Sequence, residues 1–155
     1  MRITKWGEYG ILCTIFLAKM MEEEVSVTAQ DIAKTQSIPL QYTHQILQRL
    51  RKGEIVESVR GPKGGYKLSR IPSEINLRQV LEASEGTTFE VICDSSPPYG
   101  DKCGQEHHCA LSGVWRELKA TIDATLEQKT VGDLVRHHDF YPGQTEETLV
   151  RIRES

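Results

Sequence analysis

The sequence lacks an apolar run long enough to span a membrane as a helix. Its most apolar stretch, residues 9–21, is interrupted by Lys19 and followed by three glutamates. No secretory signal is recognisable, because the apolar run near the N-terminus carries Glu8 and has no small-residue cleavage site. We therefore expect a cytoplasmic protein without a membrane partner.

Signatures of common enzyme classes are also missing. The chain contains no phosphate-binding loop, no nucleophile–base set and no paired catalytic carboxylates. Internal repeats and low-complexity tracts are absent, and 26% charged with 38% hydrophobic residues is ordinary for a globular protein. The sequence thus predicts a protein that is not an enzyme, built as one domain or as a domain with an appendage.

Cysteine is scarce, but its distribution is informative. Three of the four cysteines, Cys93, Cys103 and Cys109, lie in one stretch rich in glycine, proline and serine, with nine and five residues between them. Such a composition is typical of a loop, so these thiols are not expected to fill a core. In a reducing compartment, grouped cysteines indicate metal or redox chemistry more often than disulfides. Thiolates are soft ligands that suit iron–sulfur centres.

Zinc is the alternative metal. His107 or His108 would complete a tetrahedral site with the three cysteines, although the spacing lacks the compact Cys-x-x-Cys pairs of common zinc sites. The fourth cysteine, Cys13, falls inside an apolar helix and is interpreted as a core residue.

The net charge is only −3, but the charges are unevenly distributed. Residues 1–72 hold 11 Lys and Arg against 7 Asp and Glu, whereas residues 73–155 hold 8 against 15. Seven of the basic residues lie between Arg49 and Arg70, accompanied by two glutamates. Because local charge governs contact with phosphate, the N-terminal part is the candidate nucleic-acid-binding face.

The N-terminal half has the pattern of a winged helix-turn-helix. Apolar residues predict a buried helix over about residues 5–21, a capping box at Thr28 starts a second helix, and Pro39 starts a third that ends at Gly53. Two short strands, residues 55–60 and 66–69, flank a Gly-Pro-Lys-Gly-Gly turn whose glycines are expected at positive φ. The inward positions of the third helix are Thr43, Ile46, Leu47 and Leu50.

Two groups of side chains are candidates for contact with double-stranded DNA. The outward face of the third helix offers side chains suited to base edges and phosphates, and the hairpin tip offers basic side chains beside glycines. The alternative interpretation is an ordinary solvent-exposed face and a solvated basic turn. The candidates are Gln41, Tyr42, His44, Gln45 and Arg51 in the helix, and Arg60, Lys63 and Gly64 at the tip.

The second half of the chain is also expected to be helical. Asn76 caps a short helix that stops at Gly86, and Thr130 begins a last short helix. Between them, a longer helix carries apolar residues at steps of four and three, a coiled-coil-like stripe that needs a partner. A homodimer would provide one. The stripe consists of Leu111, Trp115, Leu118 and Ile122.

The expected fold is mainly α-helical with a small β-hairpin: a winged helix-turn-helix plus a long dimerisation helix. The predicted parts are a DNA-binding domain over residues 1–72, a connecting helix over 73–92, a cluster-binding loop over 93–110, the dimerisation and terminal helices over 111–138, and a polar tail over 139–155.

Several motifs resemble a known family. They are the opening Met1-Arg2-Ile3-Thr4, residues 48–52 (Gln-Arg-Leu-Arg-Lys), residues 59–66 (Val-Arg-Gly-Pro-Lys-Gly-Gly-Tyr) and residues 115–118 (Trp-Arg-Glu-Leu). Together with the three cysteines they are similar, over nearly the whole chain, to the Rrf2 family of iron–sulfur-sensing bacterial repressors, which includes IscR-like, NsrR-like and RsrR-like members. The resemblance implies a homodimer whose two winged helices read a palindromic operator, with a cluster held near the dimerisation helix.

The sequence departs from the family patterns at the fourth ligand. IscR-like members have a histidine three positions after the last cysteine, where this chain has Ser112. NsrR-like and RsrR-like members use a carboxylate near the N-terminus, a place taken here by Glu8, while the histidine of RsrR-like members is replaced by Leu12. The resemblance therefore implies that the three cysteines act with Glu8 of the partner subunit. His107 and His108 are rival ligands, and Glu8 has an alternative role as a dipole-favoured residue in the first turn of a helix.

Two hypotheses follow. In the first, an iron–sulfur cluster, with 4Fe–4S favoured over 2Fe–2S, sets the operator affinity in response to redox state, nitric oxide or iron–sulfur status. In the second, a zinc-binding or cluster-free winged-helix regulator responds to a ligand or a partner protein.

Overall fold

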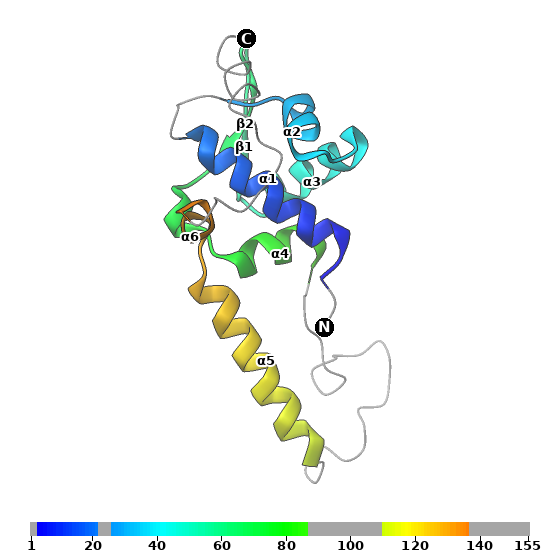
Figure 1. Cartoon of the computed structure of the whole chain (residues 1–155), viewed down its shortest axis with the longest axis vertical. Helices are drawn as coiled ribbons and strands as arrows, with labels where there is room; N and C mark the ends of the chain where they lie inside the picture. The colour runs from blue at the N-terminus through cyan, green and yellow to red at the C-terminus, as the bar shows by residue number, and fades with distance from the viewer. Residues whose placement is uncertain (1–2, 22–25, 87–109, 137–155) are drawn as a thin grey trace.

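The computed structural model describes residues 3–21, 26–86 and 110–136, and it confirms a mainly helical fold with one two-stranded hairpin (Figure 1). The elements in chain order are α1 (Lys5–Met21), α2 (Ala29–Gln36), α3 (Leu40–Lys52), β1 (Val56–Val59), β2 (Gly65–Leu68), the 3-10 turn η1 (Pro72–Glu74), α4 (Leu77–Glu85), α5 (Ala110–Gln128) and α6 (Val131–Arg136).

The predicted helix-turn-helix is present as α2 and α3. Thr28 caps α2 in a reciprocal box with Asp31, and Ser37 turns the chain with a left-handed φ of 54°. The helix α3 begins at Leu40 and is followed by Gly53, as expected. All four inward positions predicted for α3 are buried, and they pack on α1, which is buried along most of its length.

The hairpin pairs β1 with β2 in antiparallel register, Val56 opposite Leu68 and Val59 opposite Gly65. Residue Val27 adds a third short bridge through two backbone hydrogen bonds with Tyr66, of 2.8 and 3.0 Å. These bonds fasten β2, next to the tip of the hairpin, to the segment that leads into α2, so the hairpin and the helix-turn-helix form one unit.

The glycines of the hairpin tip serve two purposes rather than the single one predicted. Only Gly61 has a positive φ, 120°. Gly64 and Gly65 lack one, so the expectation of positive φ was wrong for them. A Cβ at either would lie 2.5 Å from a backbone oxygen, that of Val59 or that of Val27. The tip therefore needs its last two glycines because the backbones approach closely.

The first turns of α1 pack directly on α4 through two glycines. A Cβ on Gly10 would lie 1.9 Å from Ser84 Oγ, and one on Gly7 would lie 2.8 Å from side-chain atoms of Glu85 and Leu81. Ser84 cannot easily retreat, since it is fully buried and its hydroxyl donates to the Val80 carbonyl over 2.7 Å. The close contact of α1 with α4 thus depends on the absence of a side chain.

Gly10→Ala should lower the free energy of unfolding by about 1–3 kcal/mol, because the added methyl group forces α1 and α4 apart. Urea unfolding would measure the change. Gly113→Ala is the matched control, since a Cβ at this position on α5 meets nothing within 4 Å and alanine favours the helix. Equal destabilisation by both substitutions would show that the contact of α1 with α4 is not tight.

The helix α5 projects from the rest of the molecule, and only its C-terminal end is close to α4 (Figure 1). An isolated bridge between Asn76 and Thr130 fixes that end, with Leu77 N donating to the Lys129 carbonyl over 2.9 Å. On α4, the Arg78 guanidinium binds Glu82 on its own helix and Glu127 on α5. No helix in the described ranges is long and apolar enough to cross a membrane.

After α5 the chain returns to the core through α6. Thr130 caps this helix, as predicted, through reciprocal hydrogen bonds with Asp133. The donated bonds from Thr130 lower the pKa of Asp133 to about 2. Val131 is buried in the same hydrophobic core as the residues of α1 and α3.

Candidate nucleic-acid interface

The outward face of α3 is polar and exposed. Successive helical residues are rotated by 100°, so side chains at i, i+4, i+7 and i+11 share one face. Gln41, Gln45, Gln48 and Lys52 have this spacing, and all four are exposed on the side opposite the buried residues, with His44 exposed beside them. This face presents amide and imidazole groups that suit base edges and an ammonium group that suits phosphate.

Two members of this face, Gln48 and Lys52, were not among the predicted DNA-binding residues. The signal was available, because the i+7 and i+11 spacing from Gln41 places them in line with it. The predicted candidate Arg51 is also exposed, but it lies on the flank shared by Leu40 and His44.

Tyr42 lies on the opposite flank of α3, which faces α1. Its ring contacts the rings of Trp6 and Tyr9, with centroids 5.3 and 6.4 Å apart, while the residue stays 44% exposed. Two helical turns further along α3, the guanidinium carbon of Arg49 lies 4.2 Å from the centre of the Trp6 ring. Tyr42 and Arg49 therefore hold α3 against α1 and present only part of their surface to a ligand.

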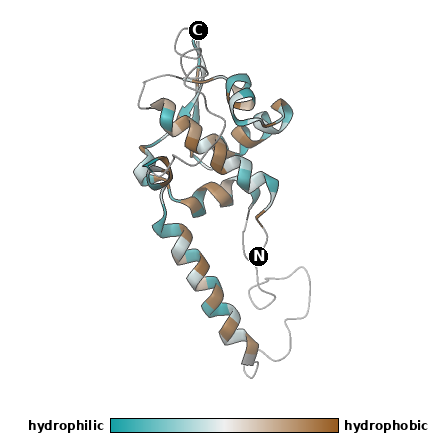
Figure 2. Cartoon of the chain, viewed as in Figure 1, coloured by the Kyte–Doolittle hydropathy of each residue, from teal (hydrophilic) through white to brown (hydrophobic). Residues whose placement is uncertain are grey.

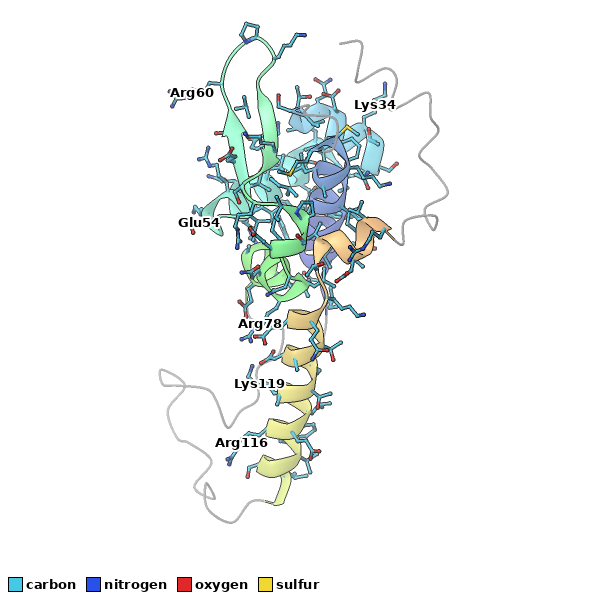
Figure 3. The ribbon with its side chains drawn as sticks, turned by 90° about the vertical axis from the view of Figure 1, so that its left-hand side faces the viewer. Lys34, Glu54, Arg60, Arg78, Arg116 and Lys119 are labelled. Atoms are coloured by element: carbon cyan, nitrogen blue, oxygen red, sulfur yellow. The ribbon has the colours of Figure 1, made fainter. Side chains whose placement is uncertain are left out.

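The wing, residues 59–66, presents its basic side chains to solvent. Arg60 and Lys63 are exposed, and Arg60 extends outward from the hairpin, far from Glu54 at the other end (Figure 3). Ser26 Oγ donates to the Lys63 carbonyl over 2.6 Å, and Gly64 N donates to the Gly61 carbonyl over 2.9 Å, so the tip is tied both to itself and to the start of the helix-turn-helix.

The basic residues of the segment 49–70 differ in their surroundings. Lys67 forms an ion pair of 3.0 Å with Glu57 across the hairpin. Within the described part of the chain, Arg51, Arg60 and Lys63 have no carboxylate within ion-pair distance. Their positive charge is therefore uncompensated locally and available to a polyanion.

The carboxylate proposed as a cluster ligand, Glu8, is in the first turn of α1. Its side chain is 57% exposed and meets the ammonium of Lys5 at 3.6 Å, a loose surface pair. Among the described residues only Lys5 forms an ion pair with this carboxylate, so its oxygens are compatible with a role as a metal ligand. The three cysteines and both rival histidines, Cys93, Cys103, Cys109, His107 and His108, lie outside the described residues, and the described residues alone bring no three metal-ligating side chains together.

Cys13 is a core residue, as predicted. It is fully buried, and burial raises the pKa of its thiol to about 12. A thiol with this pKa is almost entirely protonated at neutral pH and is a poor metal ligand.

Apolar residues recur along the projecting helix α5 (Figure 2), and most of the predicted stripe is exposed in the single chain. Leu111, Trp115 and Leu118, with Val114 beside them, are between 40% and 58% exposed, while Ile122 is half-buried. Large apolar side chains gathered on one face of a projecting helix are typical of a surface that binds another protein.

An exposed polar helix beside a basic hairpin, on a three-helix core, defines a winged-helix DNA-binding protein. The chain belongs to the Rrf2 family, described as iron-dependent transcriptional regulators, which it matches over residues 3–137. It is 33% identical to the HTH-type transcriptional regulator IscR of Serratia proteamaculans over 139 residues, covering 90% of this chain and 82% of that protein. The IscR of Klebsiella pneumoniae is 32% identical over 140 residues, covering 90% and 83%.

Solved structures agree. The IscR of T. potens superposes with a TM-score of 0.70 at 26% identity, covering 95% of this chain and 96% of that one. CymR, the global cysteine regulator of B. subtilis, gives a TM-score of 0.69 at 25% identity, covering 90% and 99%. The chain is therefore a transcriptional regulator of the Rrf2 type, and these relatives are regulators rather than enzymes.

Proposed function

We propose that this regulator is a cytoplasmic homodimer that binds a palindromic DNA operator and whose operator affinity is controlled by an iron–sulfur cluster. The observation that carries the DNA-binding part is the exposed outer face of α3 next to a wing whose basic side chains have no acidic partner among the described residues. The iron-dependent description of the family supports the iron-containing cofactor.

Cys93, Cys103 and Cys109 would hold the cluster, with Glu8 of the partner subunit as the fourth ligand. When bound, the cluster supplies a redox-active and oxidant-sensitive centre. Glu8 fits such a role because its carboxylate is exposed and bound only loosely by Lys5. A carboxylate is a harder ligand than a thiolate and binds iron more weakly, so Glu8 would be the ligand that a bound cluster loses most readily.

The turn of α1 that contains Glu8 is in contact with α3, so a movement of this turn can be transmitted to α3. It sits between Trp6 and Tyr9 in the same turn of α1, and both aromatic rings contact Tyr42 on α3. A shift of this turn when the carboxylate gains or loses its metal would therefore alter the packing behind the DNA-reading face. That contact supports a link between ligand state and operator affinity.

The exposed stripe of α5 supports the dimer. In a two-fold pair, the stripe of one protomer would cover that of its partner and remove these side chains from water. A helix of 19 residues is about 28 Å long, which is long enough to separate two reading heads.

The test of the cofactor is anaerobic purification followed by absorption spectroscopy and by assays of iron, zinc and acid-labile sulfide. Visible absorption with matching iron and sulfide supports the proposal. A colourless sample with bound zinc supports the zinc-binding alternative instead. A colourless, metal-free dimer that binds DNA supports a cluster-free regulator.

Arg60→Ala should weaken operator binding by about 1–3 kcal/mol, because the side chain extends from the wing and has no acidic partner in the part of the chain that the structure describes, so it is free to enter a groove. Fluorescence anisotropy at fixed salt would measure the change. Glu57→Ala is the control. Glu57 is on β1, three residues before Arg60, and has the opposite charge, so its removal should leave DNA binding unchanged or tighten it. Wild-type affinity for a folded Arg60→Ala protein would remove this residue from the interface.

A further inference from the structure

Arg49 is the first of the seven basic residues between positions 49 and 70. The residue is exposed, yet its guanidinium makes two contacts within the protein. Its guanidinium stacks over Trp6 of α1, 4.2 Å from the ring centre. One of its terminal nitrogens, Nη1, donates to the carbonyl of Ser84 over 2.7 Å. A single side chain on α3 thus contacts both helices that pack behind it.

The acceptor of this hydrogen bond is in the last turn of α4. Carbonyls in the last turn of a helix have no partner within the helix, and a cation there is favoured by the helix dipole. The same turn is tied to α1, because Glu85 accepts hydrogen bonds from the backbone and hydroxyl of Thr4. Arg49 therefore joins α3 to a junction where the start of α1 and the end of α4 are already fastened together.

A lysine would not replace this arrangement. The planar guanidinium can stack on an indole through its face and donate a hydrogen bond from its edge at the same time, whereas an ammonium group does one or the other. Arg49 is at the i+7 position from Tyr42, and the Tyr42 ring contacts the same Trp6 ring two helical turns earlier on the same flank of α3. The flank is thus held at two points along α3.

We propose that Arg49 is a positioning residue for the DNA-reading face and not a contact to phosphate. By fixing the rotation of α3 against α1 and α4, it sets which base edges Gln41, Gln45 and Gln48 meet. The inference rests on the DNA-binding function proposed above and assigns a specificity-determining role within it.

The two roles differ in what they do to binding. A phosphate contact contributes equally to all sequences, and its loss lowers the slope of log affinity against log salt by about one. A positioning residue affects only the contacts that discriminate between sequences. Its loss reduces the preference for the operator without changing the salt dependence. Partial unfolding of a variant would lower the active fraction on every duplex alike and would leave the preference unchanged.

The test uses two duplexes: one selected by the full-length wild-type protein from a random-sequence library, and a scrambled duplex of the same length. Both are titrated at several KCl concentrations. Arg49→Lys keeps the charge and should reduce the preference for the selected duplex by about tenfold, with the salt slope unchanged. Trp6→Leu removes the stacking partner without touching any charge and should have the same effect.

Lys52→Gln is the matched control, since this lysine lies on the outward face of the same helix. It should weaken both duplexes by the same factor and lower the salt slope by about one. Wild-type preference in both Arg49→Lys and Trp6→Leu would overturn the positioning role. So would an Arg49→Gln protein that behaves like Lys52→Gln. If the wild-type protein enriches no duplex at all, the proposed DNA-binding function is wrong, and this inference is wrong with it. If the wild-type protein selects a duplex but the variants keep its preference, only the positioning role of Arg49 is wrong.

Discussion

Serine in place of Cys93, Cys103 or Cys109 should abolish the visible absorption of anaerobically purified protein. A site with three thiolates has too few soft donors left when one is removed, so each cysteine is expected to be required. The measurement is absorption between 300 and 600 nm, roughly the range of sulfur-to-iron charge transfer, together with iron and sulfide content. Cys13→Ala is the matched control, because its thiol is buried and its pKa is raised to about 12.

Glu8→Ala separates the candidate fourth ligands. Only one hard ligand is lost, so a cluster should still assemble but should decay faster in air or show an altered spectrum. His107→Ala and His108→Ala should have almost no effect. If a histidine substitution destroys the chromophore while Glu8→Ala does not change it, the fourth ligand is a histidine and the proposed route through the first turn of α1 is wrong.

Charged residues in the stripe of α5 should break the dimer. Leu118→Glu combined with Ile122→Glu places two carboxylates where an apolar surface is expected to meet its copy, and the variant should sediment as a monomer or become insoluble. Burial of two unpaired carboxylates costs several kcal/mol, roughly the whole of a modest dimer affinity. Sedimentation velocity would measure the mass.

Ala120→Glu combined with Ala124→Glu is the control for the dimer. Both alanines are exposed on α5, on the side away from the stripe, and glutamate is tolerated well in helices. This variant should remain a dimer. A native dimer in both variants would mean that protomers pair through another surface, and a monomer in both would mean that added charge, not the stripe, governs assembly.

The elements that could be predicted from the sequence depend on neighbours along the chain. Thr28 and Asp31 form their capping box within one turn, and Asn76 and Gln79 do the same at the start of α4. The inward face of α3 follows from helical spacing alone, and all four of its predicted residues are buried. Local hydrogen bonds and local periodicity explain why the helix-turn-helix and the presence of the hairpin were predicted correctly. The strand limits were not: strands were expected over residues 55–60 and 66–69, and they are Val56–Val59 and Gly65–Leu68.

The features that could not be predicted depend on contacts between distant segments. Val27 joins the hairpin from a position far from both strands, and Gly10 is required by Ser84, which lies 74 residues later. From the sequence alone, Arg49 looks like a residue that contacts phosphate, because it lies in a basic segment. Only the packing of α1 and α4 shows that its partners are Trp6 and Ser84. No spacing rule connects such residues, because their proximity is decided by the assembled core.

The residues of the candidate site also fall into those that local sequence patterns predict and those that depend on distant contacts. The outward residues of α3 and the basic tip of the wing were predicted from spacing and charge, and they are exposed as expected. The flank occupied by Tyr42 was not distinguished from that face, because the rings of Trp6 and Tyr9 come from another helix. The cluster ligands stay a prediction, drawn from the resemblance and from the chemistry of thiolates.

The bridge between Asn76 and Thr130 has a consequence for how such regulators diversify. Gly86 follows one end of α4, and Thr130, which follows α5, pairs with Asn76 at the other end of the same nine-residue helix. The two anchor points are therefore about 13 Å apart, and both belong to the body that carries α3 and the wing. Exchange of the sequence between these two points with that of another family member would transfer the three cysteines proposed as cluster ligands and the apolar stripe of α5 together, and would leave the residues of α3 and the wing unchanged.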